Sequence, residues 1–415
     1  MSNNDIVVGL DIGTTKVCVL VAEPNEDGGI DIRGMGTAPS TGMHKGMVTN
    51  VDRTVAAIRQ AKEEAQRIAG VRINSAYVGV AGGHVNSFNT IGMVGVENRT
   101  ITARDIERVK ATALVMSPPV DREILHTITQ EYTVDDMSGI LDPPIGLSGS
   151  RLEVQVHVIT GAVNAVHNVI NCALKADIEV DDIILESVAS AESVLTPEER
   201  QMGVAILDSG GGTTDIAVYA GGRIRHTAVL AMGGNHLNSD LAQGLHVSMD
   251  FAEKLKIDYG FCDPILAPYD DDIIIVPSFN GSAAEQGLRR SLICNFLSAR
   301  VEEILEFINS EFIRSGCDEQ INEIVLTGGS SLLPGFADLS RRIIARPTRL
   351  GRPGSNVSGL TEIVRDPRYA TAVGLCLFSL RQDDPGTPKS MGSKKGRDKS
   401  IFTWIRDRLS SFFKN

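Results

Sequence analysis

The sequence lacks the hydrophobic runs and the positive charge that mark membrane-spanning and nucleic-acid-binding proteins. No stretch approaches the roughly 20 apolar residues of a transmembrane helix. Across 415 residues, 40 Lys and Arg stand against 52 Asp and Glu, which gives a formal net charge of −12. Because such a surface repels phosphate backbones, we expect no nucleic-acid partner. The N-terminus enters a strand pattern without a basic region or cleavage site, so we also expect no secretory signal.

Paired cysteines are missing as well. The chain has 6 scattered cysteines and no C-x-x-C pair: Cys18, Cys172, Cys262, Cys294, Cys317 and Cys376. Most lie in apolar runs, which predicts reduced, buried thiols in a cytosolic protein. The remaining composition, 42% apolar and 22% charged, is ordinary for a soluble protein, and the length predicts two or more domains.

What the sequence does contain is a glycine-rich loop between two strands, in residues 203–220. An apolar run reaches Asp208, breaks into a loop and resumes as an alternating strand after Asp215. The loop consists of Gly210, Gly211, Gly212, Thr213 and Thr214. A minimal hairpin turn needs only about two special residues, whereas three glycines let backbone N–H groups approach an anion. The threonines add hydroxyl donors, and the flanking carboxylates can hold water around Mg²⁺.

A second copy of this pattern lies near the start of the chain. From Ile6 a strand leads to Asp11, then to a turn with Gly13, Thr14 and Thr15, and a second strand returns from Lys16. Two such hairpins about two hundred residues apart predict two similar halves that face each other across one phosphate chain.

A third glycine-rich element follows the apolar strand at residues 324–327. Gly328, Gly329 and Ser330 form a turn, and Leu332 leads into a helix. Glycines at the end of a strand permit a flat ligand to approach closely, and the start of a helix supplies free N–H donors.

The rest of the chain predicts alternating helices and strands. We expect a helix over residues 53–69 with Asp52 as its N-cap and Gly70 as its end, and a long helix from about Glu285 to Ser315. Residues 196–200 read as a turn. Two helices rich in small residues, 186–195 and 366–380, are suited to cross each other closely between the halves.

The C-terminal residues differ sharply in composition. Residues 382–400 are charged and rich in Gly and Pro, which predicts a disordered linker. Residues 401–415 then place bulky apolar side chains on one half of a helix: Ile401, Phe402, Trp404, Ile405, Leu409, Phe412 and Phe413. A core helix is the alternative, but a long basic linker favours a helix that lies on an anionic membrane surface.

The three glycine-rich elements resemble the nucleotide site of the superfamily of actin, sugar kinases and heat-shock chaperone ATPases. The resemblance implies an α/β, actin-like fold of two related halves around a cleft for ATP and Mg²⁺. Asp11 and Asp208 would hold the metal through water, and residues 13–16 and 210–214 would cradle the phosphates. Adenine would lie against residues 328–330, in the loop that continues to Leu332.

Further roles come only from this resemblance. Glu186 falls roughly where many members orient the attacking water, although a surface or capping role is an equal alternative. Glu253 and Lys256 would line the nucleotide's sugar, with a solvated ion pair as the alternative. Gly234 begins the helix before the one that carries Glu253 and Lys256, and it would also contact the nucleotide. Turnover is expected to be slow.

An early insert and the tethered C-terminal helix narrow the resemblance to the family of the bacterial cell-division protein FtsA. The insert follows a G-V-A-G-G strand end at residues 79–83. The implied domains are residues 1–83 with 163–194 and 365–381 (first half), 84–162 (insert), 195–232 with 286–364 (second half), 233–285 (small subdomain), 382–400 (linker) and 401–415 (membrane helix).

The resemblance implies an adaptor that forms filaments at the cytoplasmic face of the inner membrane, at the division site. The C-terminal peptide of FtsZ would dock on residues 233–285, and the insert at 84–162 would meet later division proteins and neighbouring copies. Ser209 departs from the aliphatic residue usual in the family, which could weaken packing behind the loop. A pilus-assembly-type actin-like ATPase and a small-molecule kinase of the same superfamily remain alternatives.

Overall fold

The computed structural model describes residues 6–115, 119–263, 265–266, 272–276, 286–354, 356–380 and 389–390. The predicted membrane helix at 401–415 and most of the predicted linker at 382–400 lie outside the described residues. No described helix is long and apolar enough to cross a membrane. All six cysteines are unpaired and buried, as predicted.

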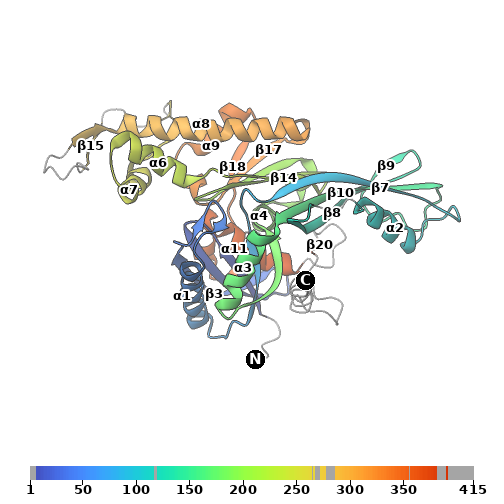
Figure 1. Cartoon of the computed structure of the whole chain (residues 1–415). Helices are drawn as coiled ribbons and strands as arrows, with labels where there is room; N and C mark the ends of the chain where they lie inside the picture. The colour runs from blue at the N-terminus through green and yellow to red at the C-terminus, as the bar shows by residue number, and fades with distance from the viewer. Residues whose placement is uncertain are drawn as a thin grey trace.

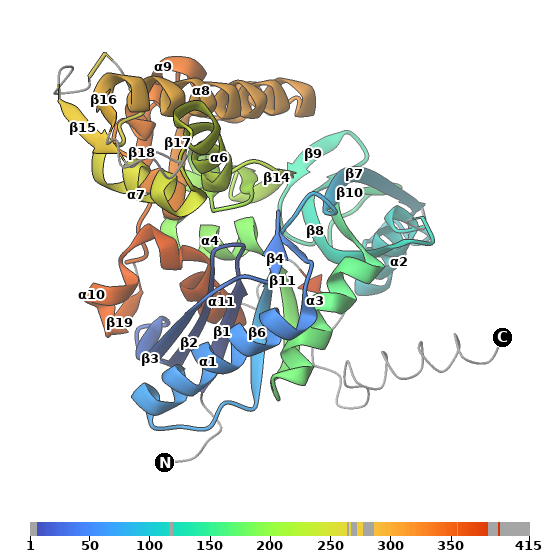
Figure 2. The same ribbon diagram turned by 60° about the vertical axis from the view of Figure 1, so that its left-hand side comes forward.

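The first half of the molecule is a six-stranded sheet between two pairs of helices (Figures 1 and 2). In spatial order the strands are β11 (Glu179–Leu185), β6 (Ser75–Val80), β1 (Val7–Ile12), β2 (Lys16–Pro24), β3 (Ile30–Pro39) and β19 (Val357–Gly359). One face carries α1 (Val51–Ala69) and α3 (Val163–Lys175), and the other carries α4 (Glu186–Val194) and α11 (Ala370–Leu380). A small hairpin, β4 (Met43–His44) with β5 (Met47–Val48), precedes α1.

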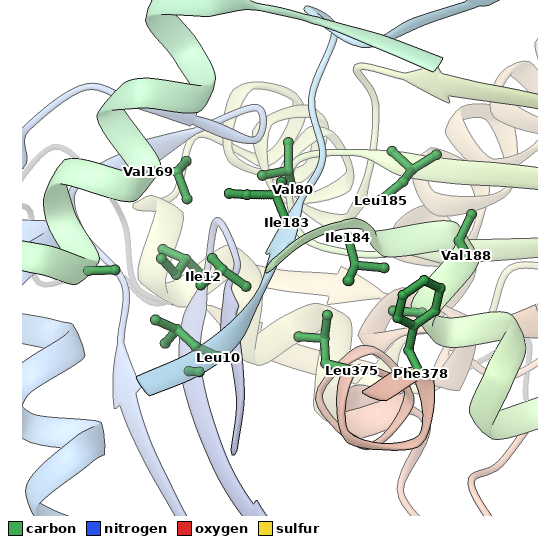
Figure 3. Packing of buried hydrophobic residues seen from close by; sticks show 14 of the residues in the cluster. Leu10, Ile12, Val80, Val169, Ile183, Ile184, Leu185, Val188, Leu375 and Phe378 are labelled. Atoms are coloured by element: carbon green, nitrogen blue, oxygen red, sulfur yellow. The ribbon is translucent and has the colours of Figure 1, made fainter. Parts of the chain in front are cut away.

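The strand pattern explains this two-sided packing. Side chains alternate along β2, so Val17, Val19 and Val21 join the core under α1. Cys18, Leu20 and Ala22 face the other way and pack with α11. Figure 3 shows that Leu375 and Phe378 of α11 lie beside Ile184 and Val188. Because both faces are covered, the strand reads as a continuous apolar run.

The second half repeats the same topology. Its sheet runs β14 (Arg223–Leu230), β13 (Thr214–Ala220), β12 (Val204–Ser209), β17 (Glu323–Thr327) and β18 (Thr348–Leu350). Both sheets have three antiparallel strands joined to parallel ones, since β6 joins β1 and β17 joins β12 in parallel. Around it lie α5 (Pro197–Met202), α6 (Gly234–Leu245), α7 (Met249–Tyr259), α8 (Arg290–Ser315), α9 (Phe336–Ile344), η1 (Asp318–Gln320) and η2 (Gly329–Leu332).

The insert forms a separate sheet with its own apolar core (Figure 1). It contains β7 (Asn86–Gly95), α2 (Ala103–Ala113), β8 (Arg122–Val134), β9 (Met137–Ile140) and β10 (Arg151–Ala162). The two-residue strand β20 (Lys389–Ser390) pairs with β8 in antiparallel orientation. Two residues of the predicted linker are therefore in a strand. The insert contacts the second half through His157, whose ring nitrogens lie 2.7 Å from Asn89 Oδ1 and 2.9 Å from Thr227 Oγ1.

Three local predictions need correction. The N-cap of α1 is Asn50, whose side chain accepts from the Arg53 N–H at 3.0 Å, and not Asp52, although the helix ends at Gly70 as predicted. The long helix α8 begins at Arg290, because β16 (Gln286–Arg289) pairs with β15 (Ile273–Val276) before it. The predicted turn at 196–200 is the start of α5, since Thr196 and Glu199 form a capping box.

The two small-residue helices cross as predicted, directly behind the cleft. A Cβ atom added at Gly374 of α11 would lie 1.7 Å from the Ala189 carbonyl oxygen of α4. No larger residue fits there unless the helices separate. After β18 of the second half the chain returns to the first half as β19, and it then reaches α11 through α10 (Thr361–Val364) and η3 (Pro367–Tyr369).

Candidate functional site

The two predicted hairpin loops have the same geometry and meet face to face. The Gly13 N–H donates to the Lys16 carbonyl at 3.0 Å, and the Gly210 N–H donates to the Thr213 carbonyl at 2.9 Å. The two turns are therefore equivalent, with Asp11 and Asp208 at matching strand positions. Their threonines are not equivalent, because residues 14–15 correspond to residues 211–212.

Glycine is required in the second turn because the first turn occupies the space. A Cβ atom at Gly211 would lie 2.3 Å from Thr15 Cγ2, and one at Gly212 would lie 2.5 Å from Thr14 Oγ1. At Gly210 the nearest atom would be the Thr213 carbonyl oxygen at 3.6 Å, an ordinary contact. Two of the three glycines thus permit contact between the halves.

Four acidic side chains gather beneath these turns. Asp11, Asp208 and Glu186 line one cavity, and Asp215 is buried beside Asp208. Burial raises the pKa of Glu186 well above its usual value, and the charges of Asp11, Asp215 and Asp208 add to the effect. Burial and the charge of Asp208 raise the pKa of Asp215 to about 8. The cluster is therefore short of positive charge.

The sequence did not reveal what holds Asp208. Ser190 of α4 and Thr371 of α11 both donate hydroxyl hydrogen bonds to Asp208 Oδ2, the latter at 3.0 Å. The two hydroxyls lie 3.0 Å apart. Both residues read as packing positions in small-residue helices, so only the helix crossing shows their contact with the loop.

Lys16 supplies positive charge at the edge of the acidic cluster. Its Nζ atom lies 3.4 Å from Asp11 Oδ2 and donates to the Arg368 carbonyl at 2.6 Å. The ammonium group also stands 5.0 Å from the centre of the Tyr369 ring. Burial is the largest single effect on the pKa of Lys16 and lowers it, but Asp11, Cys18 and Tyr369 together outweigh burial and the pKa is raised. Lys16 therefore stays charged.

The remaining predicted nucleotide residues line a neighbouring cavity of about 480 Å³. Gly234, Glu253, Lys256, Gly329, Ser330 and Leu332 all border it. Lys256 Nζ contacts Glu253 Oε2 at 2.8 Å, and Asn238 also donates to that carboxylate. Gly328 lines the acidic cavity instead, where a Cβ atom would lie 2.4 Å from Asp208 Oδ1.

The two cavities share one border, made by residues of both halves. Thr15, Lys16, Gly211, Gly329 and Arg368 line both of them. The Gly210 carbonyl accepts from the Gly234 N–H at 3.0 Å and from Ser330 Oγ at 2.8 Å. These bonds join the second turn to α6 and to η2, so one continuous site runs between the halves.

Thr214 is the predicted site residue that the structure places away from both cavities. Its hydroxyl donates to the Met232 carbonyl at 2.9 Å and lies 3.2 Å from Ser209 Oγ. The same contact gives the buried Ser209 hydroxyl a partner behind the loop. Ser209 is thus accommodated by Thr214, and Thr213 is the threonine that lines the acidic cavity.

The donor set fits a divalent cation that is held partly by water. Among the described residues, no three His, Cys, Asp or Glu side chains lie close enough together to bind a metal ion directly. One oxygen of Asp215 is nevertheless buried without a hydrogen-bond partner, within an acidic cluster. Hard carboxylate oxygens and room for water suit Mg²⁺, which keeps several of its waters in proteins.

Comparison with known proteins gives consistent matches along the chain. The family model "Cell division protein FtsA" matches residues 205–374, and the "SHS2 domain inserted in FTSA" matches residues 82–160. A cell division protein FtsA of Pseudomonas aeruginosa is 43% identical over 96% of this chain and 95% of its own. The FtsA of Escherichia coli K12 is 35% identical over 100% of this chain and 98% of its own.

Solved structures show the same fold at low identity. The "PilM-PilN type IV pilus biogenesis complex" aligns with a TM-score of 0.67 at 16% identity, covering 90% of this chain and 98% of the other. MreB5 of Spiroplasma citri bound to ADP aligns with a TM-score of 0.53 at 14% identity, covering 91% and 97%. The predicted actin-like fold with an inserted subdomain is confirmed.

Proposed function

Since this chain belongs to the FtsA family of cell-division proteins, we propose that it is an ATP-binding, actin-like division protein that acts as a membrane adaptor. One observation carries the nucleotide part of the proposal: two equivalent turns, at residues 13–16 and 210–213, meet above a buried acidic cluster. Backbone N–H groups from both halves then converge on one site, which suits a phosphate chain. The neighbouring cavity suits the nucleoside.

The residues of the site divide into three roles. Lys16 and the two turns would hold the phosphates, and Asp11 and Asp208 would hold Mg²⁺ through water. When bound, Mg²⁺ neutralises charge on the phosphates and on the carboxylates. Glu186, which lines the same cavity, would orient a water molecule. We expect slow turnover.

The adaptor part of the proposal concerns the surfaces away from the cleft. The apolar face at residues 401–415 would bind the cytoplasmic side of the inner membrane at the division site. The C-terminal peptide of FtsZ would dock on residues 233–285. The insert would contact later division proteins and neighbouring copies within a filament. One short helix anchors weakly, so membrane binding would depend on many copies acting together.

The two alternatives predicted from the sequence have less support. The likeness to the pilus complex is at 16% identity and concerns the fold, whereas the relatives at 35% and 43% identity are division proteins. A small-molecule kinase would have no use for the apolar pattern predicted as a membrane helix at residues 401–415. The ADP bound to the MreB5 neighbour supports a nucleotide in this fold.

Substitutions of two lysines in α7 test whether the cavity binds a nucleotide. Lys256 borders the nucleoside cavity, whereas Lys254 is exposed on the same helix. With Mg²⁺ present, calorimetry should show ATP binding to the full chain, weakened by Lys256→Ala and by Lys16→Ala but not by the control Lys254→Ala. A wild-type chain without affinity for ATP would refute the proposal.

A flotation assay tests the membrane role separately. The full chain should float with liposomes that contain anionic lipids, and a chain ending at Gln382 should stay at the bottom. The substitution Trp404→Glu should reduce flotation without shortening the linker. Equal flotation of the full and shortened chains would contradict the adaptor role and leave ATP binding unaffected.

A further inference from the structure

Residues 366–369, here called the crossing segment, lead into α11 and contact both halves of the molecule. It consists of Asp366 and η3, and α11 follows it directly. No glycine-rich pattern marks these residues in the sequence, and none of them was predicted as a site residue. The crossing segment nevertheless contacts the nucleotide site on both sides.

Towards the second half, the segment holds the strand end that borders the acidic cavity. The Pro367 carbonyl accepts from the Gly328 N–H at 3.3 Å and from Thr327 Oγ1 at 3.4 Å. Pro367 itself lines the cavity. A shift of the segment would therefore also shift the loop at residues 328–330.

Towards the first half, the segment holds the ammonium group of Lys16. The Arg368 carbonyl accepts from Lys16 Nζ at 2.6 Å, and the Tyr369 ring centre lies 5.0 Å from the same atom. A cation over an aromatic face is stabilised most where water is excluded. Arg368 and Tyr369 together thus fix the position of Lys16 beside Asp11.

The side chain of Arg368 lies where the two cavities meet. Its Nε and Nη2 atoms donate to the two oxygens of Asp366 at 3.0 and 2.8 Å. Asp366 thereby orients the guanidinium, whose central carbon also lies 5.9 Å from the centre of the Tyr369 ring, and no described residue accepts a hydrogen bond from Nη1. Of the side chains that line the two cavities, the cationic ones are Lys16, Lys256 and Arg368. Arg368 thus brings positive charge between the nucleoside cavity and the turns.

We propose that the crossing segment is a third phosphate-binding element of this protein. The Arg368 guanidinium binds the polyphosphate directly, and the Arg368 carbonyl with the Tyr369 ring positions Lys16 for the same ligand. The ligand class is a nucleoside di- or triphosphate, in preference to a nucleoside. This inference rests on the proposed nucleotide function, and it adds residues that neither hairpin loop contains.

Affinities for ATP and for adenosine, measured by calorimetry on the full chain, test the direct contact. The substitution Arg368→Gln should weaken ATP binding about tenfold or more, because a charge-assisted hydrogen bond to phosphate is lost. It should leave adenosine binding unchanged, and Arg368→Lys should restore part of the ATP affinity. The matched control Arg365→Gln removes the same charge from an exposed neighbour outside both cavities and should change neither affinity.

A second pair of variants tests the positioning of Lys16. Tyr369→Leu removes the aromatic face and should weaken ATP binding about threefold to tenfold. Tyr369→Phe keeps the ring and should restore most of the ATP affinity that Tyr369→Leu loses. Thermal unfolding without ligand verifies that each variant folds.

The outcomes separate this inference from the proposed function. If Arg368→Gln weakens ATP and adenosine binding equally, the residue only shapes the cavity and the inference is overturned. Unchanged ATP binding in the Arg368 variants also overturns it, while ATP binding by the wild type still supports the proposed function. If the wild-type chain binds no ATP, both this inference and the proposed nucleotide function are refuted.

Discussion

The contact between the two turns predicts a large effect of a single methyl group. A Cβ atom at Gly211 would lie 2.3 Å from Thr15 Cγ2 and 3.2 Å from Thr15 Oγ1. Carbon atoms in contact prefer about 3.5–4.0 Å, so Gly211→Ala requires a displacement of roughly 1.2–1.7 Å. Such overpacking costs about 1–3 kcal/mol. If the closed contact is required for binding, ATP affinity falls by roughly fivefold to 150-fold.

Two matched variants make this prediction specific. Gly210→Ala adds the same methyl group where the nearest atom is 3.6 Å away, and it should bind ATP nearly as the wild type does. Thr15→Ser removes the clashing Cγ2 methyl but keeps the hydroxyl, so the double variant with Gly211→Ala should recover most of the affinity. The assay is equilibrium binding of ATP with Mg²⁺. Equal losses in Gly210→Ala and Gly211→Ala, or no recovery in the double variant, would refute the reasoning.

Further predictions concern stability. Gly374→Ala should lower the midpoint of thermal unfolding, because its Cβ would lie 1.7 Å from the Ala189 carbonyl oxygen and would push α4 and α11 apart. Burial and the charge of Asp208 raise the pKa of Asp215 from 3.8 to about 8, so the ligand-free folded protein keeps a proton that the unfolded chain releases. The free energy of unfolding should therefore fall as pH rises from 3.8 towards 8 and then level off. Asp215→Asn should flatten this dependence, as followed by thermal unfolding across that range.

Elements that a short sequence motif specifies could be predicted from the sequence. The two strand–Asp–Gly hairpins predicted two related halves, and the topologies of the two sheets match. The sequence pattern Gly-Thr-Thr, however, matched Thr14 and Thr15 of the first loop with Thr213 and Thr214 of the second. The backbone hydrogen bond from Gly210 to Thr213 fixes a different register, and Thr214 falls behind the loop.

The contacts that sequence could not predict join residues far apart in the chain. Ser190 and Thr371 both bind Asp208, yet each is a small polar residue in a small-residue helix. The Arg368 carbonyl, which holds Lys16, is a backbone atom that every residue type has. Such roles depend on the crossing of α4 and α11 and on the path of the chain between the halves, and neither leaves a periodic pattern.

The division of the first half among distant segments has a consequence for synthesis on the ribosome. Its sheet begins with β1 at Val7, but the last strand is β19 at residues 357–359 and the last helix, α11, ends at Leu380. The sheet of the second half lies within residues 204–350 and can form from one continuous stretch of chain. Non-local contacts form slowly because the intervening loop must first close. The half that leaves the ribosome first is thus completed last, and a nascent chain cannot assemble the full site until residue 380 has emerged.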